Sequence, residues 1–374
     1  MIIMALDHVR DYFHYAAFTD SPTNLMTTTP LLFFTRWITH FCAPTFLLLS
    51  GVSAYLLGQK KTKKELSIFL VKRGCWLVLM ELFIVTLAWT FDPLYHVFIL
   101  QVIWAIGVSM IILGLLIWLP LNAILLCGLL IIGLHNLLDI PESSKDAQIG
   151  LLWNLAHHGK FTEIHLWPHH IGIIVYAFLP WTGIMILGYG IGRIFTPAYN
   201  RERKKILFIS GSFAILLFLI LRSYNHYGDP EHWHFIRSRL FSWLSFFNLS
   251  KYPPSLDYIS LTLGIALIVL GFLDRISKDS FSFLRIFGRV PFFFYVLHLY
   301  LIHTLTVILF FIQGYQSKDI LPQHSPFMFR PDNFGFGLAG VYLIWIAVIL
   351  ILYPPCRWYD NFKTTHKKWW LSYL

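Results

Sequence analysis

Nine runs of about 20 mostly apolar residues recur along the chain and limit its fold more than any other feature. They span residues 38–58, 74–91, 97–119, 121–138, 170–193, 206–222, 256–273, 290–313 and 334–353. A helix of about 20 residues crosses the ~30 Å hydrocarbon core with its backbone groups bonded to one another. Charged residues make up only 13% of the chain, against about 25% in soluble proteins. The sequence therefore predicts an all-α integral membrane protein, with residues 1–374 as one polytopic domain.

The opening stretch, MIIMALDHVRDYFHYAAF, has an apolar part that is too short to cross a membrane alone. It has no basic region and no small-residue cleavage site, so we do not interpret it as a signal peptide. It is typical of the second half of a helix. We therefore expect a bundle of about ten helices, the first of them truncated, with the true start upstream of Met1.

Basic residues indicate the orientation of the bundle, because short cytoplasmic loops are enriched in Lys and Arg. Nineteen of the 29 basic residues fall in one set of loops. They are Lys60, Lys61, Lys63, Lys64, Lys72, Arg73, Arg193, Arg201, Arg203, Lys204, Lys205, Arg275, Lys278, Arg285, Arg289, Arg357, Lys363, Lys367 and Lys368. This set predicts a multi-pass protein of the inner (plasma) membrane with a cytoplasmic C-terminus. The net charge of +10 does not indicate nucleic-acid binding, since the basic residues form short clusters between apolar runs.

Histidine has the opposite bias, since of 17 histidines only His366 is clearly on the basic side. Those on or near the other side are His14, His40, His96, His157, His158, His165, His169, His170, His226, His232, His234 and His324. Imidazoles titrate near neutral pH and suit acid–base work. We expect such chemistry, or the binding of polar ligands, at the outer face.

The densest polar cluster lies in the opening stretch, at Asp7, His8, Arg10, Asp11 and His14. Helical spacing places Asp7, His8 and Asp11 on one face and Arg10 with His14 on a neighbouring one. Ionisable groups in a membrane helix are costly and usually mark a functional path. An Asp beside a His suits a general base. The alternative is a salt-bridged cap that only anchors the helix.

Two further segments hold candidate binding residues. Arg36 and His40 stand one turn apart in RWITHFCAPTFLLLSG, where they could bind an anionic or sugar-like group or, with Trp37, merely anchor the helix at the interface. His298 lies well inside the span that contains VPFFFYVLHLYLIH, and its alternative role is a histidine satisfied by a neighbouring helix.

Metal and nucleotide motifs are not recognisable in the sequence. The segment HLWPHH offers three imidazoles without a carboxylate or cysteine at ligand spacing, and Pro168 interrupts the helix that an i, i+4 pair needs. The four cysteines form no CxxC pair. There is no P-loop, GxGxxG after a strand, GxSxG or HExxH. We therefore predict no metal.

Five segments together resemble a known family. They are MIIMALDHVRDYFH, RWITHFCAPTFLLLSG, FILQVIWAIGVSMI, LPWTGIMILGYGIGRI and VPFFFYVLHLYLIH. The family is the heparan-α-glucosaminide N-acetyltransferase catalytic-domain family, in its bacterial branch of transmembrane acyltransferases. The resemblance implies ten or eleven helices, cytosolic acetyl-CoA as donor and an amino sugar across the membrane as acceptor. It places the catalytic histidine at His14 and a polar residue of the first helix at His8.

The sequence thus favours a membrane acyltransferase that carries an acyl group from acyl-CoA to a sugar or glycan acceptor. His14 would be the base, assisted by His8 and Asp11, while Asp7, Arg10, Arg36, His40 and His298 would bind substrate. Partners are the lipid bilayer and the acceptor, and a homodimer is compatible with the chain. One alternative is a transporter or flippase for a sugar or envelope precursor, although the inverted repeats common in transporters are not visible. Another is a non-catalytic partner in envelope assembly.

Overall fold

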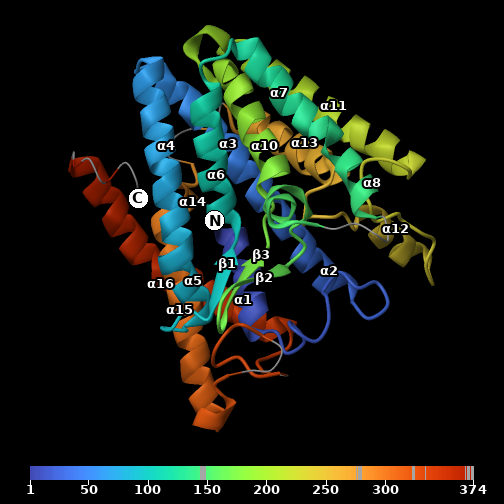
Figure 1. Cartoon of the computed structure of the whole chain (residues 1–374), viewed down its shortest axis with the longest axis vertical. Helices are drawn as coiled ribbons and strands as arrows, with labels where there is room; N and C mark the ends of the chain where they lie inside the picture. The colour runs from blue at the N-terminus through green and yellow to red at the C-terminus, as the bar shows by residue number, and fades with distance from the viewer. Residues whose placement is uncertain are drawn as a thin grey trace. The chain divides into compact units, whose positions relative to one another are not determined.

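The computed structural model describes residues 1–143, 149–274, 276, 280–321, 325–332, 334–366, 368 and 371, and these are mostly helical (Figure 1). Four residues of the sets named above, Arg275, Lys278, His324 and Lys367, lie outside the described residues. Within the described ranges, seven helices are long and apolar enough to cross a membrane. They are Pro30–Gly58, Leu121–Glu142, Phe178–Phe195, Arg203–Tyr224, Leu256–Leu273, Pro291–Ile312 and Leu338–Thr365. The predicted all-α polytopic membrane fold is confirmed.

Two of the nine expected spans are not among these seven. In place of a helix over 97–119, the chain forms strand β1 (Val97–Leu100) and then the shorter helix α6 (Val102–Leu116). The start of α6 is set by Glu81, whose carboxylate accepts the backbone N–H groups of Gln101 and Trp104, each at 3.1 Å. The expected span 74–91 is divided among α4 (Lys63–Met80), a π-helical turn (Glu81–Val85) and α5 (Thr86–Thr90). The helix therefore widens to a π-helical turn at the point where the side chain of Glu81 caps α6.

A third expectation, a span over 170–193, is correct only in its second part. Residues His170–Ile174 form strand β3, which pairs antiparallel with β2 (Thr162–Trp167), and the membrane helix begins later, at Phe178. The sheet has the order β1-β3-β2. Its hairpin turns at His169, whose φ of 65° is left-handed. The partner strand β2 has the alternating polar and apolar side chains of a two-sided strand in TEIHLW, and its pairing with β3 holds residues 170–174 extended.

The chain divides into two compact units, each assembled from segments far apart in sequence. Unit 1 comprises Met1–Cys42, Phe83–Val97 and Ser277–Leu374, and unit 2 comprises Ala43–Leu82 and Phe98–Ile276. In unit 1, the first helix α1 (Ile2–Phe13) packs against α15 (Pro291–Ile312) and α16 (Leu338–Thr365). Its other elements include α5, α2 (Pro30–Trp37), η1 (Ile38–Phe41), α14 (Ser282–Arg289) and η7 (Ser317–Asp319).

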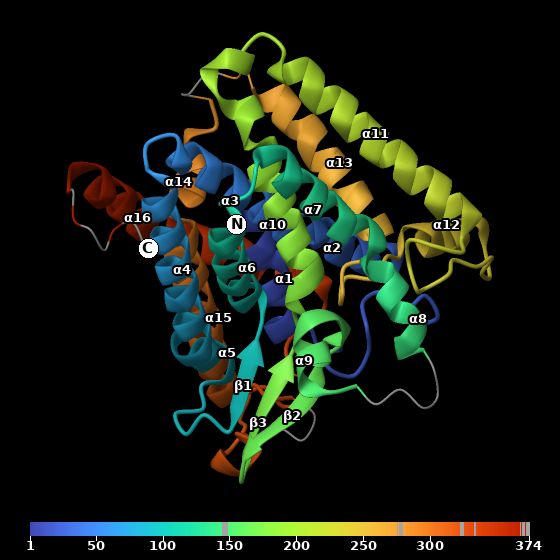
Figure 2. The same ribbon diagram turned by 45° about the horizontal axis from the view of Figure 1, so that its top comes forward.

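Unit 2 is built from paired helices, and Figure 2 shows α11 and α13 running side by side. Its long helices are α3 (Cys42–Gly58), α7 (Leu121–Leu134), α10 (Phe178–Ile191), α11 (Arg203–Tyr224) and α13 (Leu256–Leu273), besides α4 and α6. Shorter elements are η3 (His135–Leu138), α8 (Asp139–Glu142), α9 (Leu151–Trp153), η4 (Asn154–His158), η5 (Gly192–Phe195), η6 (Pro197–Tyr199) and α12 (Arg239–Phe247).

Helices α11 and α13 come close because a glycine of each faces the other's backbone. A Cβ added at Gly211 would lie 2.7 Å from the carbonyl oxygen of Gly264, and one added at Gly264 would lie 3.0 Å from that of Gly211. Helices in a membrane gain little from hydrophobic association, so close backbone packing carries much of their attraction. These two positions therefore set the spacing of the pair.

We expect Gly211→Ala to destabilise the protein by roughly 1–3 kcal/mol, because the added methyl group meets backbone atoms that cannot rotate away. The matched control is Gly133→Ala in α7, where a Cβ meets nothing within 4 Å among the described residues. That change should be neutral or slightly stabilising. The midpoint of thermal unfolding in detergent measures both, and equal midpoints for the two variants would contradict the proposed packing.

Candidate functional site

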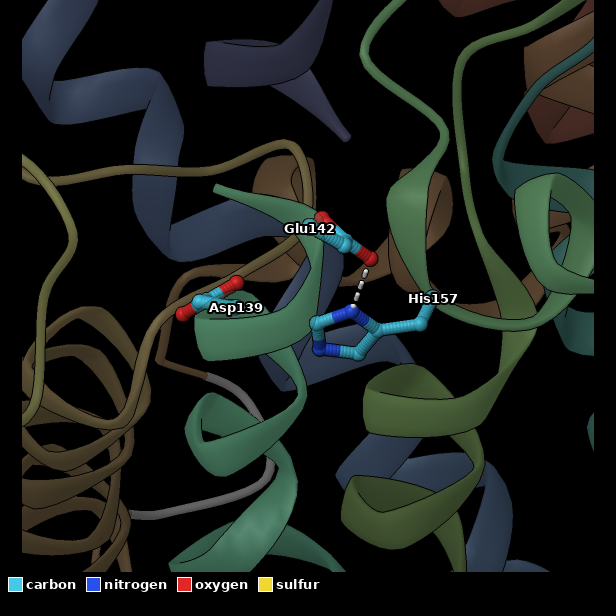
Figure 3. Close-up of side chains that lie close together, drawn as sticks. All are labelled: Asp139, Glu142 and His157. Carbon is cyan, nitrogen blue, oxygen red and sulfur yellow. Dashed lines mark hydrogen bonds and ion pairs between the residues drawn. The ribbon is translucent and has the colours of Figure 1, made fainter. Parts of the chain in front are cut away.

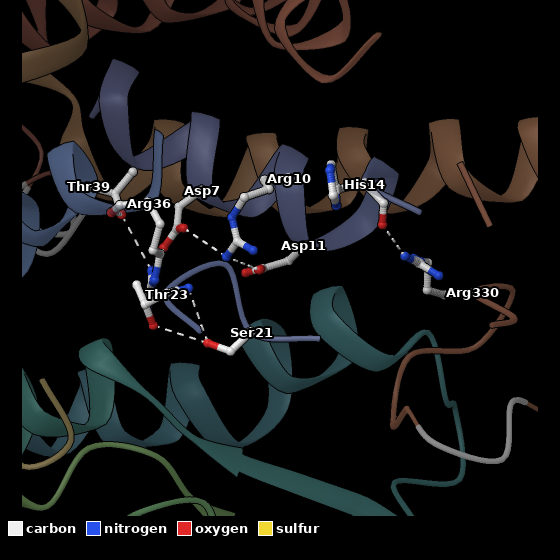
Figure 4. A network of polar contacts seen from close by, with 9 residues as sticks. All are labelled: Asp7, Arg10, Asp11, His14, Ser21, Thr23, Arg36, Thr39 and Arg330. Atoms are coloured by element: carbon white, nitrogen blue, oxygen red, sulfur yellow. Dashed lines mark hydrogen bonds and ion pairs between the residues drawn. The ribbon is translucent and has the colours of Figure 1, made fainter. Parts of the chain in front are cut away.

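The polar face of α1 is the most highly charged buried region of unit 1. Asp7, His8 and Arg10 are buried on a helix whose other residues, apart from Asp11 and Tyr12, are apolar. Arg10 donates to Asp7 Oδ1 at 3.1 Å and to Asp11 Oδ1 at 2.6 Å. Figure 4 shows this guanidinium lying between the two carboxylates. The expected grouping of these residues on adjacent helix faces is therefore present, with Arg10 joined to the acids.

Asp7 also binds a second arginine from outside the helix. Its Oδ2 accepts a hydrogen bond from Arg36 of α2, and Arg36 in turn lies 3.4 Å from Thr39 Oγ1. Two arginines and two aspartates balance in charge, which offsets the cost of removing each from water. Arg36 thus has a protein carboxylate beside it, and Asp7 connects α1 to α2. His40, one turn further on, is buried at 5% exposure.

His8 and His298 form a second contact of α1, this time with α15. His8 Nδ1 lies 2.7 Å from His298 Nε2, and the rings stack at 4.9 Å with an interplanar angle of 16°. His298 Nδ1 lies 3.0 Å from the carbonyl oxygen of Phe294, which can only accept a hydrogen bond. A neutral His298 therefore carries its proton on Nδ1 and accepts at Nε2 from His8 Nδ1–H. The interaction between these helices fixes the tautomer of both rings.

His14 follows the last residue of α1, and its backbone is held from the far end of the chain. Arg330 donates to the His14 carbonyl oxygen at 2.7 Å. Phe336 lies in a parallel bridge with His14, donating to the carbonyl of Phe13 at 2.7 Å and accepting from the N–H of Tyr15 at 3.1 Å. Three backbone groups around His14 are thus bonded by Arg330 and Phe336. This arrangement fixes the backbone from which the imidazole projects.

The His14 ring is buried but makes no hydrogen bond within the described residues. Its relative exposure is 5%, and it stacks on Tyr15 at 4.8 Å. Burial lowers the pKa of His14 below its ordinary value of 6.5, and the cations Arg10 and Arg330 lower it further. The ring is therefore neutral at pH 7, with one nitrogen able to accept a proton.

The structure does not join all the residues that the sequence grouped. Asp11 makes no hydrogen bond to the His14 ring; its carboxylate binds Arg10, and Figure 4 shows the ring of His14 turned away from that contact. His8 Nδ1 pairs with His298 Nε2, on the neighbouring helix α15. The face of α1 is thus divided into a charged cluster, an imidazole pair and the isolated His14.

Two buried polar residues of this region, Arg330 and Tyr12, were not singled out from the sequence. Arg330 is 1% exposed, lies between the rings of Phe18 and Phe334 at 5.2 and 5.4 Å, and bonds to His14. Its signal was a single arginine within the aromatic segment PFMFRPDNFGFG. The second is Tyr12, which donates to the carbonyl of Trp89 at 2.6 Å and lies 3.2 Å from His303 Nδ1. A tyrosine on an apolar face gave no distinguishing signal.

A sequence-family model described as "Heparan-alpha-glucosaminide N-acetyltransferase, catalytic" matches residues 1–227, which is more than half of the chain. The match confirms the family resemblance noted from the sequence. It includes α1 and α2 with all their candidate residues, and it ends before His298 and Arg330. No curated protein and no solved structure matches the chain.

The placement of His14 depends on Gly335, whose φ is +101° and whose added Cβ would lie 2.3 Å from the carbonyl oxygen of Phe13. We expect Gly335→Ala to cost roughly 1–3 kcal/mol, because it combines a strained backbone with a backbone clash. Gly337→Ala is the matched control, since a Cβ there meets no described atom within 4 Å. Thermal unfolding in detergent should show a lower midpoint for the first variant only. A wild-type midpoint for Gly335→Ala would refute the constraint.

Proposed function

The chain belongs to the heparan-alpha-glucosaminide N-acetyltransferase catalytic-domain family, and on this basis we propose that it is a membrane acyltransferase using acyl-CoA. The donor would bind from the cytosol, and an amino sugar or glycan would accept the acyl group at the outer face. The division of basic residues and imidazoles between the two sets of loops supports this direction, with an inner-membrane location and a cytoplasmic C-terminus. An anionic CoA suits a basic cytosolic face.

The observation that carries the proposal is the state of His14. It is a buried, neutral imidazole with no protein hydrogen-bond partner among the described residues, on a backbone bonded at three points. A general base needs this combination of a free lone pair, a pKa near or below the working pH and a fixed position. His8 Nδ1 is already bound to His298, which makes His14 the better candidate.

In the proposed reaction, the acceptor's amine or hydroxyl attacks the thioester carbonyl carbon while His14 takes its proton. A new N–C or O–C bond forms, the C–S bond breaks, and the CoA thiolate leaves and is protonated by the imidazolium. His14 ends neutral, so the cycle needs no further reagent. Substrate contacts at Asp7, Arg10, Arg36, His40 and His298 stay a prediction from the sequence; for His298 such a contact requires it to exchange its bond with His8. Asp11, which is 30% exposed and paired with Arg10, would assist by holding that cation beside the acceptor.

We expect His14→Ala to reduce acetyl transfer by roughly 10²–10⁴-fold, the usual contribution of a general base. The assay follows labelled acetyl from acetyl-CoA to glucosamine with protein in proteoliposomes. His165→Ala, at an exposed position of strand β2, is the control and should keep wild-type rates. Unchanged transfer by a folded His14→Ala protein would exclude His14 as the base.

Binding of acetyl-CoA separates this function from transport of a sugar or envelope precursor. Purified protein should bind acetyl-CoA, and His14→Ala should bind it equally well because the base acts on the acceptor. A transporter has no need of the thioester. Absence of acetyl-CoA binding to folded protein would overturn the acyltransferase proposal itself, whatever the outcome for His14.

The pH dependence of kcat/KM should follow the lowered pKa of His14. Because the base must be neutral, the rate is lost only as pH falls through that pKa, so the acidic limb should lie below pH 6.5. Arg330→Met removes a cation that lowers the pKa, and the limb should move upward. Arg330→Lys keeps the charge and should leave it in place. A limb at the same pH in wild type and the Met variant would contradict this electrostatic role.

A further inference from the structure

Unit 2 contains a cluster of metal-ligating side chains outside the proposed site. Asp139 and Glu142 lie one turn apart on α8, and His157 comes from the π-helical turn η4. One ligand atom from each residue lies within 4.8 Å of the others. Figure 3 shows Glu142 and His157 pointing toward one another, with Asp139 beside them. Two carboxylates and an imidazole therefore converge from two segments of the chain.

Glu142 organises this cluster, because three N–H groups are directed at its carboxylate. Oε1 accepts from His157 Nδ1 and Trp153 Nε1, both at 2.7 Å, and Oε2 accepts from His158 Nδ1 at 2.9 Å. The π-turn allows the consecutive residues His157 and His158 to face the same carboxylate. Such turns are rare in proteins and are frequent at functional sites.

The surrounding residues leave polar atoms unsatisfied, which is a second and independent observation. His135, 3% exposed, directs Nδ1 at His157 Nε2 across 3.3 Å, and its Nε2 has no partner among the described residues. Asp139 Oδ1 is also buried without a partner there. A buried polar atom left without a hydrogen bond costs about 1–3 kcal/mol. Native structures seldom tolerate several such atoms together unless a water or an ion satisfies them.

The two facing imidazoles point to the same conclusion. His157 Nδ1 donates to Glu142, so in the neutral ring Nε2 is a lone pair. If His135 is protonated on Nε2, its Nδ1 lone pair faces the Nε2 lone pair of His157, and the two repel. If His135 is instead protonated on Nδ1, it can donate to His157, but its own buried Nε2 is then a lone pair without a donor among the described residues. Neither tautomer of His135 satisfies the cluster. A cation that takes the place of the proton between His157 and Glu142 moves the ring proton of His157 to Nε2, so that the two lone pairs no longer face one another.

We propose that Asp139, Glu142 and His157 bind a divalent transition-metal ion of the Zn²⁺ class. The ion accepts the Nδ1 lone pair of His157, whose proton is then carried on Nε2 and donated to His135 Nδ1. Ligating histidines usually donate their other N–H to such an outer partner, which fixes the tautomer. Mixed imidazole and carboxylate ligands suit Zn²⁺ better than Mg²⁺, which prefers oxygen ligands alone. These residues differ from HLWPHH, whose histidines at 165, 169 and 170 are not part of the cluster.

The ion would connect the end of α8 to the π-turn η4. Glu142 and His157 are 15 residues apart in sequence, and a bond to both ties the end of α8 to the π-turn. The stability gained on binding therefore appears as a higher unfolding temperature. This inference is independent of the acyltransferase proposal, since it concerns structure and binding rather than turnover.

The test uses the full chain in detergent, freed of any affinity tag and stripped with a chelator. Zn²⁺ is titrated by calorimetry, and bound metal is counted by mass spectrometry after dialysis. We expect one Zn²⁺ per chain and a rise in the thermal midpoint. Asp139→Asn should weaken binding at least about tenfold, since even outer-shell changes typically cost that much. This variant should fold, because its amide oxygen can still accept from Asn136 Nδ2, now at 2.7 Å from Oδ2.

The matched control removes one carboxylate and one imidazole from the exposed face of β2, as Glu163→Gln with His165→Ala. It should bind Zn²⁺ with wild-type affinity and show the same rise in midpoint. Glu142→Gln should lose both. The proposal is overturned if wild type retains no stoichiometric Zn²⁺, if the control loses it equally, if Asp139→Asn binds as tightly as wild type, or if Mg²⁺ competes at equal concentration.

Discussion

A buried charge in a helical bundle must find its counter-charge within the protein, and this constraint shapes the first unit around α1. Asp7 lies between Arg10 and Arg36, and Arg10 also binds Asp11. Removing one partner of such a set leaves an uncompensated charge that costs about 3–5 kcal/mol. The four residues are therefore a single electrostatic element, which locks α2 to α1 and holds the orientation of the helix on which His8 and His14 lie.

His14 is an exception to that pattern, and the contrast indicates its role. The charged residues of α1 are paired and His8 is bonded to His298, while the ring of His14 makes no hydrogen bond to the described chain. Cations nearby keep the ring neutral rather than neutralising a charge on it. Rigid backbone and available side chain are what a preorganised base requires, because the position is fixed before the substrate arrives.

Much of the helical framework could be predicted from the sequence, because a bilayer imposes a length and an apolar composition on each span. The errors fall where a polar side chain decides the local structure. Glu81 ends one helix to cap another, and residues 170–174 form a strand although they adjoin an apolar run. Helical spacing likewise predicted which residues share α1. It could not predict the contacts of Arg36 with Asp7 or of His8 with His298, which are 29 and 290 residues apart.

The cluster of Asp139, Glu142 and His157 shows the same limit for ligand sets. Its two carboxylates have helical spacing, but the imidazole comes from a π-turn that no local pattern indicated. HLWPHH holds more imidazoles in a short stretch of sequence, at His165, His169 and His170. The structure instead places His165 and His169 at exposed positions of a hairpin.

Arg330 and Phe336, which bond to the backbone around His14, lie 316 positions or more further along the chain. The stretch that identifies the family ends at residue 227, so it contains the imidazole but not Arg330 or Phe336, which bond to the backbone around it. Substitutions of Arg330 or Phe336 should therefore disturb the end of the first helix, although both residues lie outside the region that identifies the family. Two proteins could share every residue of that region and still hold this imidazole differently, because Arg330 and Phe336 lie near the other end of the chain.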